Sequence, residues 1–269
     1  MWKLTAEEFR ARHEADYRRR FVTLEGLAAL KDGVNTAGSG PRNDIVLPAS
    51  VPALVGRFTA SAGGVTFEPE SGSDVMLASQ RVRNRVDLRS DADPGGPDEV
   101  IVGPGVSMWV HMSGDRRTVR VRDENGDQAR SFKGFHWFPV DPAFRVIGRF
   151  VRDREAQTVQ IPNLAGDLES YTTEGVVEFS IDGASLALRP MTTKTGRLYF
   201  IFRDGTSGNE TYGAARFLYT TLDADGTAVL DFNQAYNPPC AFNPFTTCPL
   251  PPPENRLAVR IPAGERFEP

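Results

Sequence analysis

Cysteine and histidine are scarce in this sequence, which holds two cysteines and three histidines in 269 residues. Structural zinc sites need a full tetrahedral set of nitrogen and sulfur ligands, usually with the cysteines only a few residues apart. Cys240 and Cys248 are separated by seven residues, and His13, His111 and His136 lie far away along the chain. We therefore expect no bound metal and no cofactor.

Long apolar runs are also missing. No stretch approaches the roughly 20 consecutive apolar residues of a membrane span. The first 21 residues, MWKLTAEEFRARHEADYRRRF, are charged and lack the apolar core of a secretory signal. The net charge of −4 creates no field that favours nucleic acid. These absences predict a cytoplasmic protein with neither membrane nor nucleic-acid partners.

A helix is predicted near the N-terminus. Thr5 and Glu8 form a capping-box pattern, in which each side chain caps the backbone amide of the other residue. The pattern predicts a helix over residues 6–19 with a thin apolar stripe and a basic face. Such a helix is typical of a solvated element packed by one edge. A patch for nucleic acid or an acidic partner is the alternative.

From Phe21 the apolar pattern changes to a period of two, which is typical of strands. Short alternating runs recur with glycine turns such as Gly63-Gly64, and this spacing indicates a β-sandwich. Later runs alternate around Asp182-Gly183 and Asp225-Gly226, which are two-residue hairpin signals. The sequence therefore predicts a mainly β protein.

The same patterns divide the chain into four predicted parts. These are an N-terminal helix (1–20), a β-sandwich (21–131), a hinge segment (132–144) and a second β-rich domain (145–269). The second domain is expected to be a barrel or a sandwich. The aromatic residues of the hinge segment are expected to lie in the contact between the domains.

The segment DFNQAYNPPCAFNPFTTCPLPPPENRL, residues 231–257, holds both cysteines and many prolines. Proline removes backbone donors and fixes φ, so the segment cannot be a helix. Its aromatic residues indicate packing rather than disorder. Long ordered loops of this kind are often functional.

This segment, together with RDGTSGNETYGAARFLY (203–219) and FKGFHWFPVDPAFRV (132–146), resembles the bacterial and archaeal DUF1684 family. The run NPPCAF…CPLPPPENRL is its most specific part, and the resemblance extends roughly from Phe21 to Phe267. The family has no known function, so the resemblance implies no activity.

The first predicted sandwich also resembles a forkhead-associated (FHA) domain over about residues 21–125, on the run GSGPRNDIVLP (38–48). Ser39 takes the place of the arginine that binds phosphate in such domains, and VPALVGRF replaces the second binding loop. Reading phosphothreonine needs a cation and loop donors. The resemblance therefore implies the sandwich without phosphothreonine binding, and a protein-interaction module is one functional hypothesis.

The two cysteines allow several interpretations. Cys240 and Cys248 can be small buried residues that pack the proline-rich loop. They can form a labile disulfide across that loop, or a zinc site with histidines. Cys240 can also act as a nucleophile with His136.

The loop 203–213 follows the apolar run LYFIF and gathers an arginine, hydroxyls and an amide. Such a loop can bind an anion through Arg203 and backbone N–H groups, or it can satisfy only its own backbone. Arg216 lies on an apolar strand and needs a partner if it points inward. We predict a buried pair with Asp231 or Glu254, or a corner of a ligand pocket.

The principal functional hypothesis is a small polar or anionic ligand bound by the second domain, with no reaction assigned. The predicted ligand-binding residues are Arg203, Asp204, Thr206, Ser207, Tyr212, Arg216, Asn237 and Cys240. We also predict that the segments 203–213 and 231–257 touch. Whether the protein is an enzyme stays open at this point.

Overall fold

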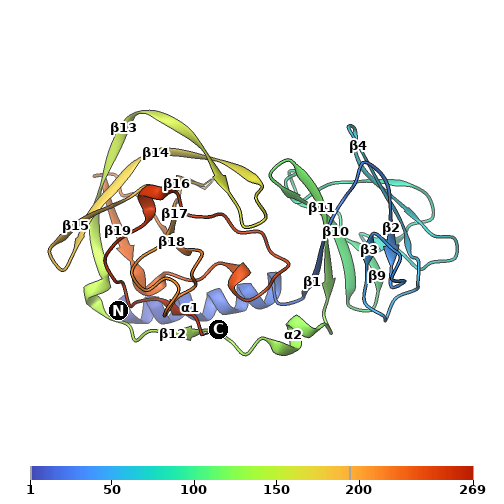
Figure 1. Ribbon diagram of the computed structural model, residues 1–269, viewed down its shortest axis with the longest axis horizontal. Helices are drawn as coiled ribbons and strands as arrows, with labels where there is room; N and C mark the ends of the chain where they lie inside the picture. The colour runs from blue at the N-terminus through green and yellow to red at the C-terminus, as the bar shows by residue number, and fades with distance from the viewer. Residues whose placement is uncertain (1, 194, 269) are drawn as a thin grey trace. The chain divides into compact units, whose positions relative to one another are not determined.

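The computed structural model describes residues 2–193 and 195–268, with side chains from residue 5 onward. The fold is mainly β, as predicted, and Figure 1 shows its strands and its N-terminal helix. The chain divides into two units. The sandwich unit consists of Tyr17–Phe132 and Asn243–Thr246. The C-terminal unit consists of Met1–Asp16, Lys133–Phe242 and Thr247–Pro269.

The N-terminal helix α1 (Trp2–Arg20) is longer than predicted. It begins before Thr5, so the capping box does not mark its start, and the predicted first turn at residue 6 is wrong. Ala6 and Tyr17 are buried, and Phe9 and His13 are half-buried between them. This spacing places the four side chains along one face of the helix. Phe9, His13 and Tyr17 were expected in the apolar stripe and lie on this face, whereas Ala11, which was also expected there, is exposed.

The sandwich unit is built from two sheets. The six-stranded sheet has the order β1-β11-β10-β9-β6-β7, and the five-stranded sheet has the order β3-β2-β4-β5-β8. The strands are β1 (Leu24–Ala29), β2 (Gly33–Gly38), β3 (Ile45–Val46), β4 (Gly56–Ser61), β5 (Gly64–Pro69), β6 (Met76–Leu77), β7 (Gln80–Arg81), β8 (Val86–Leu88), β9 (Val100–Gly103), β10 (Val106–Ser113) and β11 (Arg116–Asp123). A short helix, α2 (Asp127–Ser131), follows.

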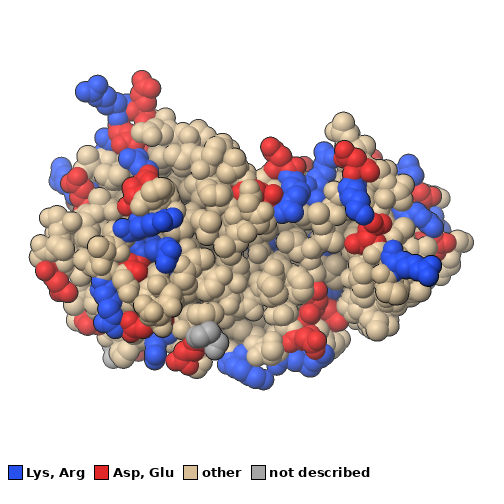
Figure 2. Space-filling view, viewed as in Figure 1, with Lys and Arg blue, Asp and Glu red and all other residues tan. Residues whose placement is uncertain are grey.

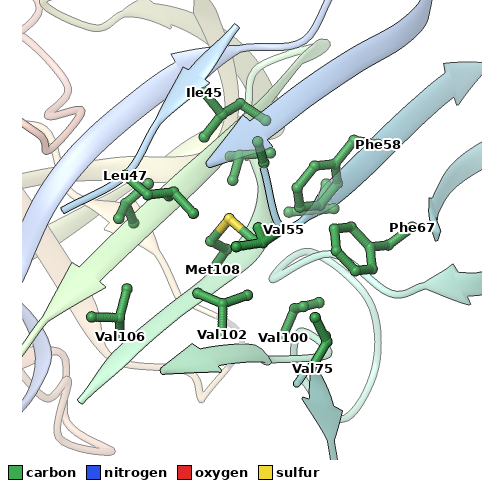
Figure 3. Close-up of a cluster of buried hydrophobic side chains, with 14 of the residues drawn as sticks. Ile45, Leu47, Val55, Phe58, Phe67, Val75, Val100, Val102, Val106 and Met108 are labelled. Carbon is green, nitrogen blue, oxygen red and sulfur yellow. The ribbon is translucent and has the colours of Figure 1, made fainter. Parts of the chain in front are cut away.

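The apolar core of this unit lies between its two sheets (Figure 3). Phe58 and Phe67 come from the five-stranded sheet, and their rings meet edge to face with centroids 4.9 Å apart. Met108 of β10 comes from the six-stranded sheet, and all three side chains are fully buried. Alternate residues of each strand therefore fill one core, as the period of two predicts.

The C-terminal unit contains three open sheets. Their strand orders are β15-β14-β13-β19, β16-β17-β18 and β12-β20. The strands are β12 (His136–Trp137), β13 (Arg145–Pro162), β14 (Leu168–Ile181), β15 (Ala184–Leu188), β16 (Met191–Thr192), β17 (Leu198–Phe202), β18 (Arg216–Thr220), β19 (Thr227–Asp231) and β20 (Glu265–Arg266). The predicted Asp182-Gly183 turn joins β14 to β15, with positive φ at both residues.

Strand β17 is buried on both faces. Leu198, Phe200 and Phe202 pack into a core shared with β14, β15 and β19. Tyr199 and Ile201 point to the other face, into a second cluster that contains Cys248. Strand β13, through Ile161, and the proline-rich segment, through Cys248, both pack in this second cluster.

The segment 231–257 is an ordered loop that contains three short 3₁₀ helices, η2 (Phe232–Gln234), η3 (Pro239–Ala241) and η4 (Pro253–Asn255). Buried asparagines fix its path. Asn233 donates to the carbonyl of Asp141 at 2.8 Å, and Asn255 donates to the carbonyl of Ile201 at 2.9 Å. Proline has no backbone N–H and cannot donate a hydrogen bond to a neighbouring carbonyl. The side-chain amides of the asparagines donate to such carbonyls instead.

The predicted hinge segment packs its aromatic residues against α1 and the core of the C-terminal unit. Phe135 stacks on His13 with ring centroids 5.0 Å apart, and Trp137 meets Phe9 edge to face at 6.5 Å. Phe144, in the 3₁₀ helix η1 (Pro142–Phe144), packs against the core beside β19. These contacts all lie within one unit.

Two surface properties complete the description. Basic and acidic side chains are interspersed on the face seen in Figure 2, with no large area of one sign in that view. No helix among the described residues is long and apolar enough to span a membrane.

Candidate functional site

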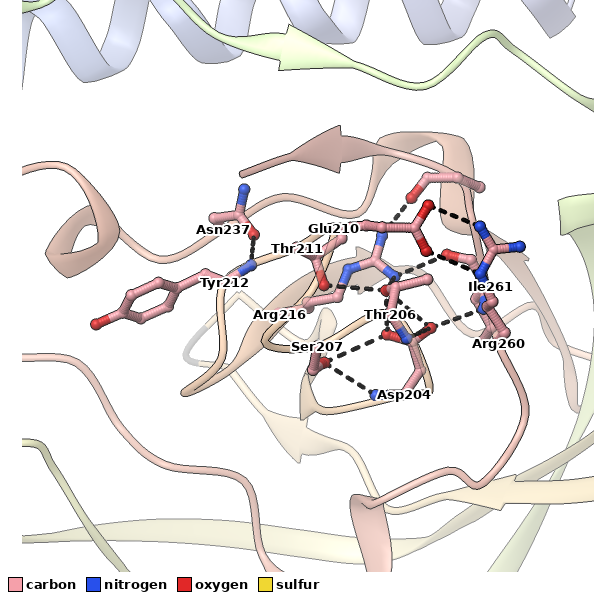
Figure 4. A network of polar contacts seen from close by, with 11 residues as sticks. Asp204, Thr206, Ser207, Glu210, Thr211, Tyr212, Arg216, Asn237, Arg260 and Ile261 are labelled. Atoms are coloured by element: carbon pink, nitrogen blue, oxygen red, sulfur yellow. Dashed lines mark hydrogen bonds and ion pairs between the residues drawn. The ribbon is translucent and has the colours of Figure 1, made fainter. Parts of the chain in front are cut away.

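Arg216 is the centre of a buried polar network, shown in Figure 4. Its side chain and that of Asp204 are both completely buried, and the Arg216 Nη1 lies 3.1 Å from the Asp204 Oδ1. The same guanidinium donates to the carbonyls of Ile261, at 3.0 Å, and Ala263. Arg216 therefore finds its counter-charge on the loop just before its own strand. The predicted pairs with Asp231 and Glu254 are wrong.

Those two acids have other contacts. Asp231 accepts from the backbone N–H of Asn233 at 3.2 Å and so caps η2. Glu254 lies 3.5 Å from the Nε of Arg189. Sequence proximity favoured these two acids as partners for Arg216. The register of β17 and β18 instead places Arg216 opposite the last residue of β17, close to the loop that carries Asp204.

Asp204 uses both carboxylate oxygens within the protein. It accepts from the hydroxyl of Thr206 at 2.8 Å and from the backbone N–H of Ile261 at 2.7 Å, besides its ion pair with Arg216. Ser207 adds a longer contact of 3.4 Å from its hydroxyl. The network ties the loop 203–211 to the segment 257–263. Asp204, Thr206 and Arg216 thus direct their polar atoms at one another and at backbone.

Arg203 is placed differently. It forms a parallel β-bridge with Arg256, in which the Arg203 N–H donates to Asn255 and the Leu257 N–H donates to the Arg203 carbonyl. Bridge partners carry their side chains on the same side of the ribbon. Among the residues that the structure describes, neither arginine has an ion pair or a side-chain hydrogen bond. The bridge therefore places two arginine side chains on the same side of the ribbon, and neither has a described counter-charge.

Asn237 links three segments. Its Oδ1 accepts from the backbone N–H of Tyr212 at 2.9 Å, and its Nδ2 donates to the Glu265 Oε1 at 3.2 Å. Its own backbone N–H donates to the Glu265 Oε2, also at 3.2 Å. The bond between Tyr212 and Asn237 confirms that the segments 203–213 and 231–257 touch.

Glu265 is fully buried, and nothing in the residues around it along the chain indicates this. Burial raises the pKa of its carboxyl, although the nearby His13 and Asn237 oppose this by stabilising the charged form. The His13 Nε2 lies 3.5 Å from the Glu265 Oε2. Phe135 and Tyr236 pack against the His13 ring, with centroids 5.0 and 4.3 Å away. A carboxylate and an imidazole are thus enclosed by aromatic rings.

Cys240 and Cys248 are neighbouring thiols. The backbone N–H of Cys240 donates to the Cys248 sulfur at 3.3 Å. Cys248 is buried and Cys240 is half-buried. The contact with Cys248, followed by burial, raises the pKa of the Cys240 thiol above its ordinary value. This environment favours the neutral thiol and suits packing better than nucleophilic chemistry.

Tyr212 completes this corner. Burial and the neighbouring Cys240 raise the pKa of its phenol to about 12. Its ring meets that of Phe267 edge to face, with centroids 5.2 Å apart. Tyr212 and Cys240 are half-buried, whereas Asn237 is buried. Among the described residues, no cluster of histidine, cysteine and acidic side chains could hold a metal ion.

The predicted residues therefore fall into three groups. The first is the Arg216 network with Asp204, Thr206 and Ser207. The second is the corner of Tyr212, Asn237 and Cys240. The third is Arg203 with Arg256. Sequence reasoning missed His13, Arg256 and Glu265, because nothing in the local pattern around them indicates a polar site.

These features describe a mainly β protein whose C-terminal unit holds buried charges under a proline-rich loop. The family described as a protein of unknown function (DUF1684) matches residues 130–266, and the chain belongs to this family. The match is narrower than the resemblance predicted from Phe21, because it leaves out the strands of the sandwich unit. The FHA resemblance of that unit stays a prediction.

Among solved structures, the chain is similar to an uncharacterized protein from Haloarcula marismortui, whose structure was solved in solution by NMR. The two are 31% identical, and the similarity covers 52% of this chain and 80% of the other, with a TM-score of 0.44. No curated protein matches this chain.

Proposed function

We propose that the C-terminal unit binds a small anionic ligand at Arg203 and Arg256. The observation that carries this proposal is the bridge between the two arginines, neither of which has a described acidic partner. Like charges on neighbouring side chains repel each other. An anion between the guanidinium groups would remove the repulsion and accept charge-assisted hydrogen bonds from both.

The frame around these arginines supports the proposal. Backbone bonds of 3.0 and 2.8 Å fix the bridge from both sides. Asp204 follows Arg203 directly and is anchored by Arg216, so the start of the loop is rigid. A site that is held in place before binding loses less entropy when the ligand arrives. In this proposal Asp204, Thr206 and Arg216 hold the loop in position and do not contact the ligand.

The remaining predicted residues would border the site. Arg203 follows Ile201 by two positions, which places it on the face of the sheet that carries Tyr199 and Ile201. The cluster on that face includes Cys248, with Cys240 at its edge. We propose Ser207, Tyr212, Asn237 and Cys240 as the polar and aromatic border, with no reaction assigned.

Isothermal titration with inorganic phosphate, acetate and citrate would test this function. We expect saturable binding of at least one of these anions. Arg203→Met and Arg256→Met should each weaken it about tenfold, because a hydrogen bond to a charged group contributes roughly 1.5–3 kcal/mol. Arg260→Met is the matched control, since Arg260 is exposed and already paired with Glu210. Equal binding by all three variants and the wild type would contradict the proposal.

The second functional hypothesis is a protein-interaction module on the sandwich unit. Its exposed large apolar residues are Val34 on β2, Val46 on β3 and Ile101 on β9, which belong to two different sheets. They offer less support than the arginine pair does. Ser39 donates to the carbonyl of Val51 at 2.8 Å, so its hydroxyl serves the loop. We expect no phosphothreonine binding, and micromolar binding of a phosphothreonine peptide, lost on dephosphorylation, would refute this.

A further inference from the structure

The outer face of β10 and β11 in the sandwich unit is polar and yet largely buried. Trp109 and His111 project from β10, and Arg120 and Arg122 project from β11 beside them, in the register Trp109↔Arg120. Trp109 is only 7% exposed and His111 only 8%. An outer sheet face normally meets solvent. Here the loop that precedes β9 covers it instead, and the covering loop brings acidic residues.

Asp91 and His111 fix one end of this face. The Asp91 Oδ2 lies 2.5 Å from the Nδ1 of His111, and the Nη2 of Arg120 lies 3.1 Å from the Nε2. A guanidinium can only donate, so the Nε2 must accept and the proton must be on the Nδ1. In this arrangement the Nδ1 of His111 donates to Asp91. The positive charge of Arg120 and the negative charge of Asp91 both remain.

Arg122 fixes the other end. Its Nη1 donates to the Glu99 Oε1 at 2.7 Å, and its Cζ lies 4.9 Å from the centre of the Trp109 ring. The Ser107 hydroxyl also donates to Glu99, at 2.6 Å. The Arg122 Nε–H has no acceptor among the described residues. Arg122 is thus held over an aromatic ring and keeps donor capacity.

A cavity of about 340 Å³ lies between these two ends. It is lined by three arginines, two carboxylates and three apolar residues: Arg20, Arg120, Arg122, Asp91, Glu99, Phe21, Pro97 and Trp109. Its volume is within the range of small-molecule sites. The three arginines outnumber the two carboxylates, so the lining has one positive charge in excess. We call this space the Trp109 cavity.

We propose that the Trp109 cavity binds a small carboxylate that carries a flat apolar body. The excess positive charge favours a monoanion, and Arg122 offers the planar donor pair that matches a carboxylate. The rings of Phe21 and Trp109, with Pro97, form the apolar part of the wall. This site is independent of the arginine pair in the C-terminal unit.

Benzoate is the probe for this proposal, with acetate and inorganic phosphate as comparison ligands. Binding to the full-length protein can be followed by titration calorimetry and by the chemical shift of the Trp109 indole N–H. We expect benzoate to bind more tightly than acetate or phosphate, because only benzoate uses the apolar wall. Arg122→Gln should weaken benzoate binding about tenfold.

Two further variants keep the test decisive if Arg122→Gln fails to fold. Glu99→Gln removes the carboxylate that competes for Arg122 and should strengthen benzoate binding several-fold. Arg117→Gln is the matched control on the same strand, because Arg117 bonds to the carbonyl of Ser61 and does not line the cavity. Absence of benzoate binding, unchanged affinity in Glu99→Gln, or equal loss in Arg117→Gln would overturn the proposal.

Discussion

The C-terminal unit buries Arg216 and Glu265 completely, and it compensates their charges in different ways. Arg216 faces a fully buried acid, Asp204, at 3.1 Å. Glu265 faces the amide of Asn237 and the ring of His13, without an arginine or lysine at hydrogen-bonding distance among the described residues. Burial disfavours both charged forms, and only an opposite charge at short range offsets it strongly.

The pKa directions reflect this difference. Burial lowers the pKa of Arg216, and Asp204 raises it again, so the guanidinium stays charged because the ordinary value of 12.5 is so high. Burial raises the pKa of Glu265, and neutral donors with a more distant imidazole do not reverse the direction. Arg216 therefore stays charged and stabilises the fold through its pair with Asp204, whereas Glu265 is able to titrate.

The largest effect on stability is expected from removing the buried charge of Arg216. Arg216→Met leaves Asp204 buried without its counter-charge and should cost about 3–5 kcal/mol in the free energy of unfolding. Urea denaturation measures this cost. Arg260→Met, which breaks an exposed pair with Glu210, is the control and should cost far less, because exposed ion pairs contribute little to stability. Similar small losses of unfolding free energy in both variants would show that the buried pair does not stabilise the fold more than the exposed pair does.

A smaller effect is expected from the pH dependence of Glu265. Because its pKa is raised in the folded protein, the folded state binds the proton more tightly than the unfolded state does. Stability from this group is complete below the ordinary pKa of 4.5 and is lost as pH rises through the raised folded value. Every tenfold difference in proton affinity between the folded and unfolded states contributes about 1.4 kcal/mol.

Glu265→Gln removes this titration and should flatten the corresponding part of the profile. The measurement is the unfolding free energy of the wild type and the variant at a series of pH values from 4.5 upward. The difference between them should change in favour of the variant as pH rises. A constant difference, or a change in the opposite direction, would mean that Glu265 is charged throughout and that the two buried charges behave alike.

The smallest effect is expected at Cys240, at the edge of the same corner. Cys240→Ala removes a half-buried thiol and should cost about 1 kcal/mol or less. Native Cys240 should react slowly with iodoacetamide at neutral pH, because contact with Cys248 and burial raise its thiol pKa. The same reaction in denaturant is the control and should be fast. Rapid stoichiometric labelling of the native protein would instead point to thiol chemistry.

Much of the fold could be predicted from local pattern. Alternation of apolar residues located β17 and β18, and the pair Asp182-Gly183 identified a turn that needs positive φ. The prolines predicted an ordered loop at 231–257, and the structure shows one. The site was less predictable. Arg203 and Arg216 look alike in the sequence, yet one has no described side-chain partner and the other is fully enclosed.

The sequence by itself determined the mainly β class, the main turns and the membership of the DUF1684 family, because each depends on residue types at short and fixed spacing. Only the tertiary structure decided that Arg216 pairs with Asp204, that Arg203 lies beside Arg256, and that Glu265 is buried. Ion pairing and burial depend on which distant segments meet. The β-bridges and buried asparagines that join those segments leave no periodic signal in the chain.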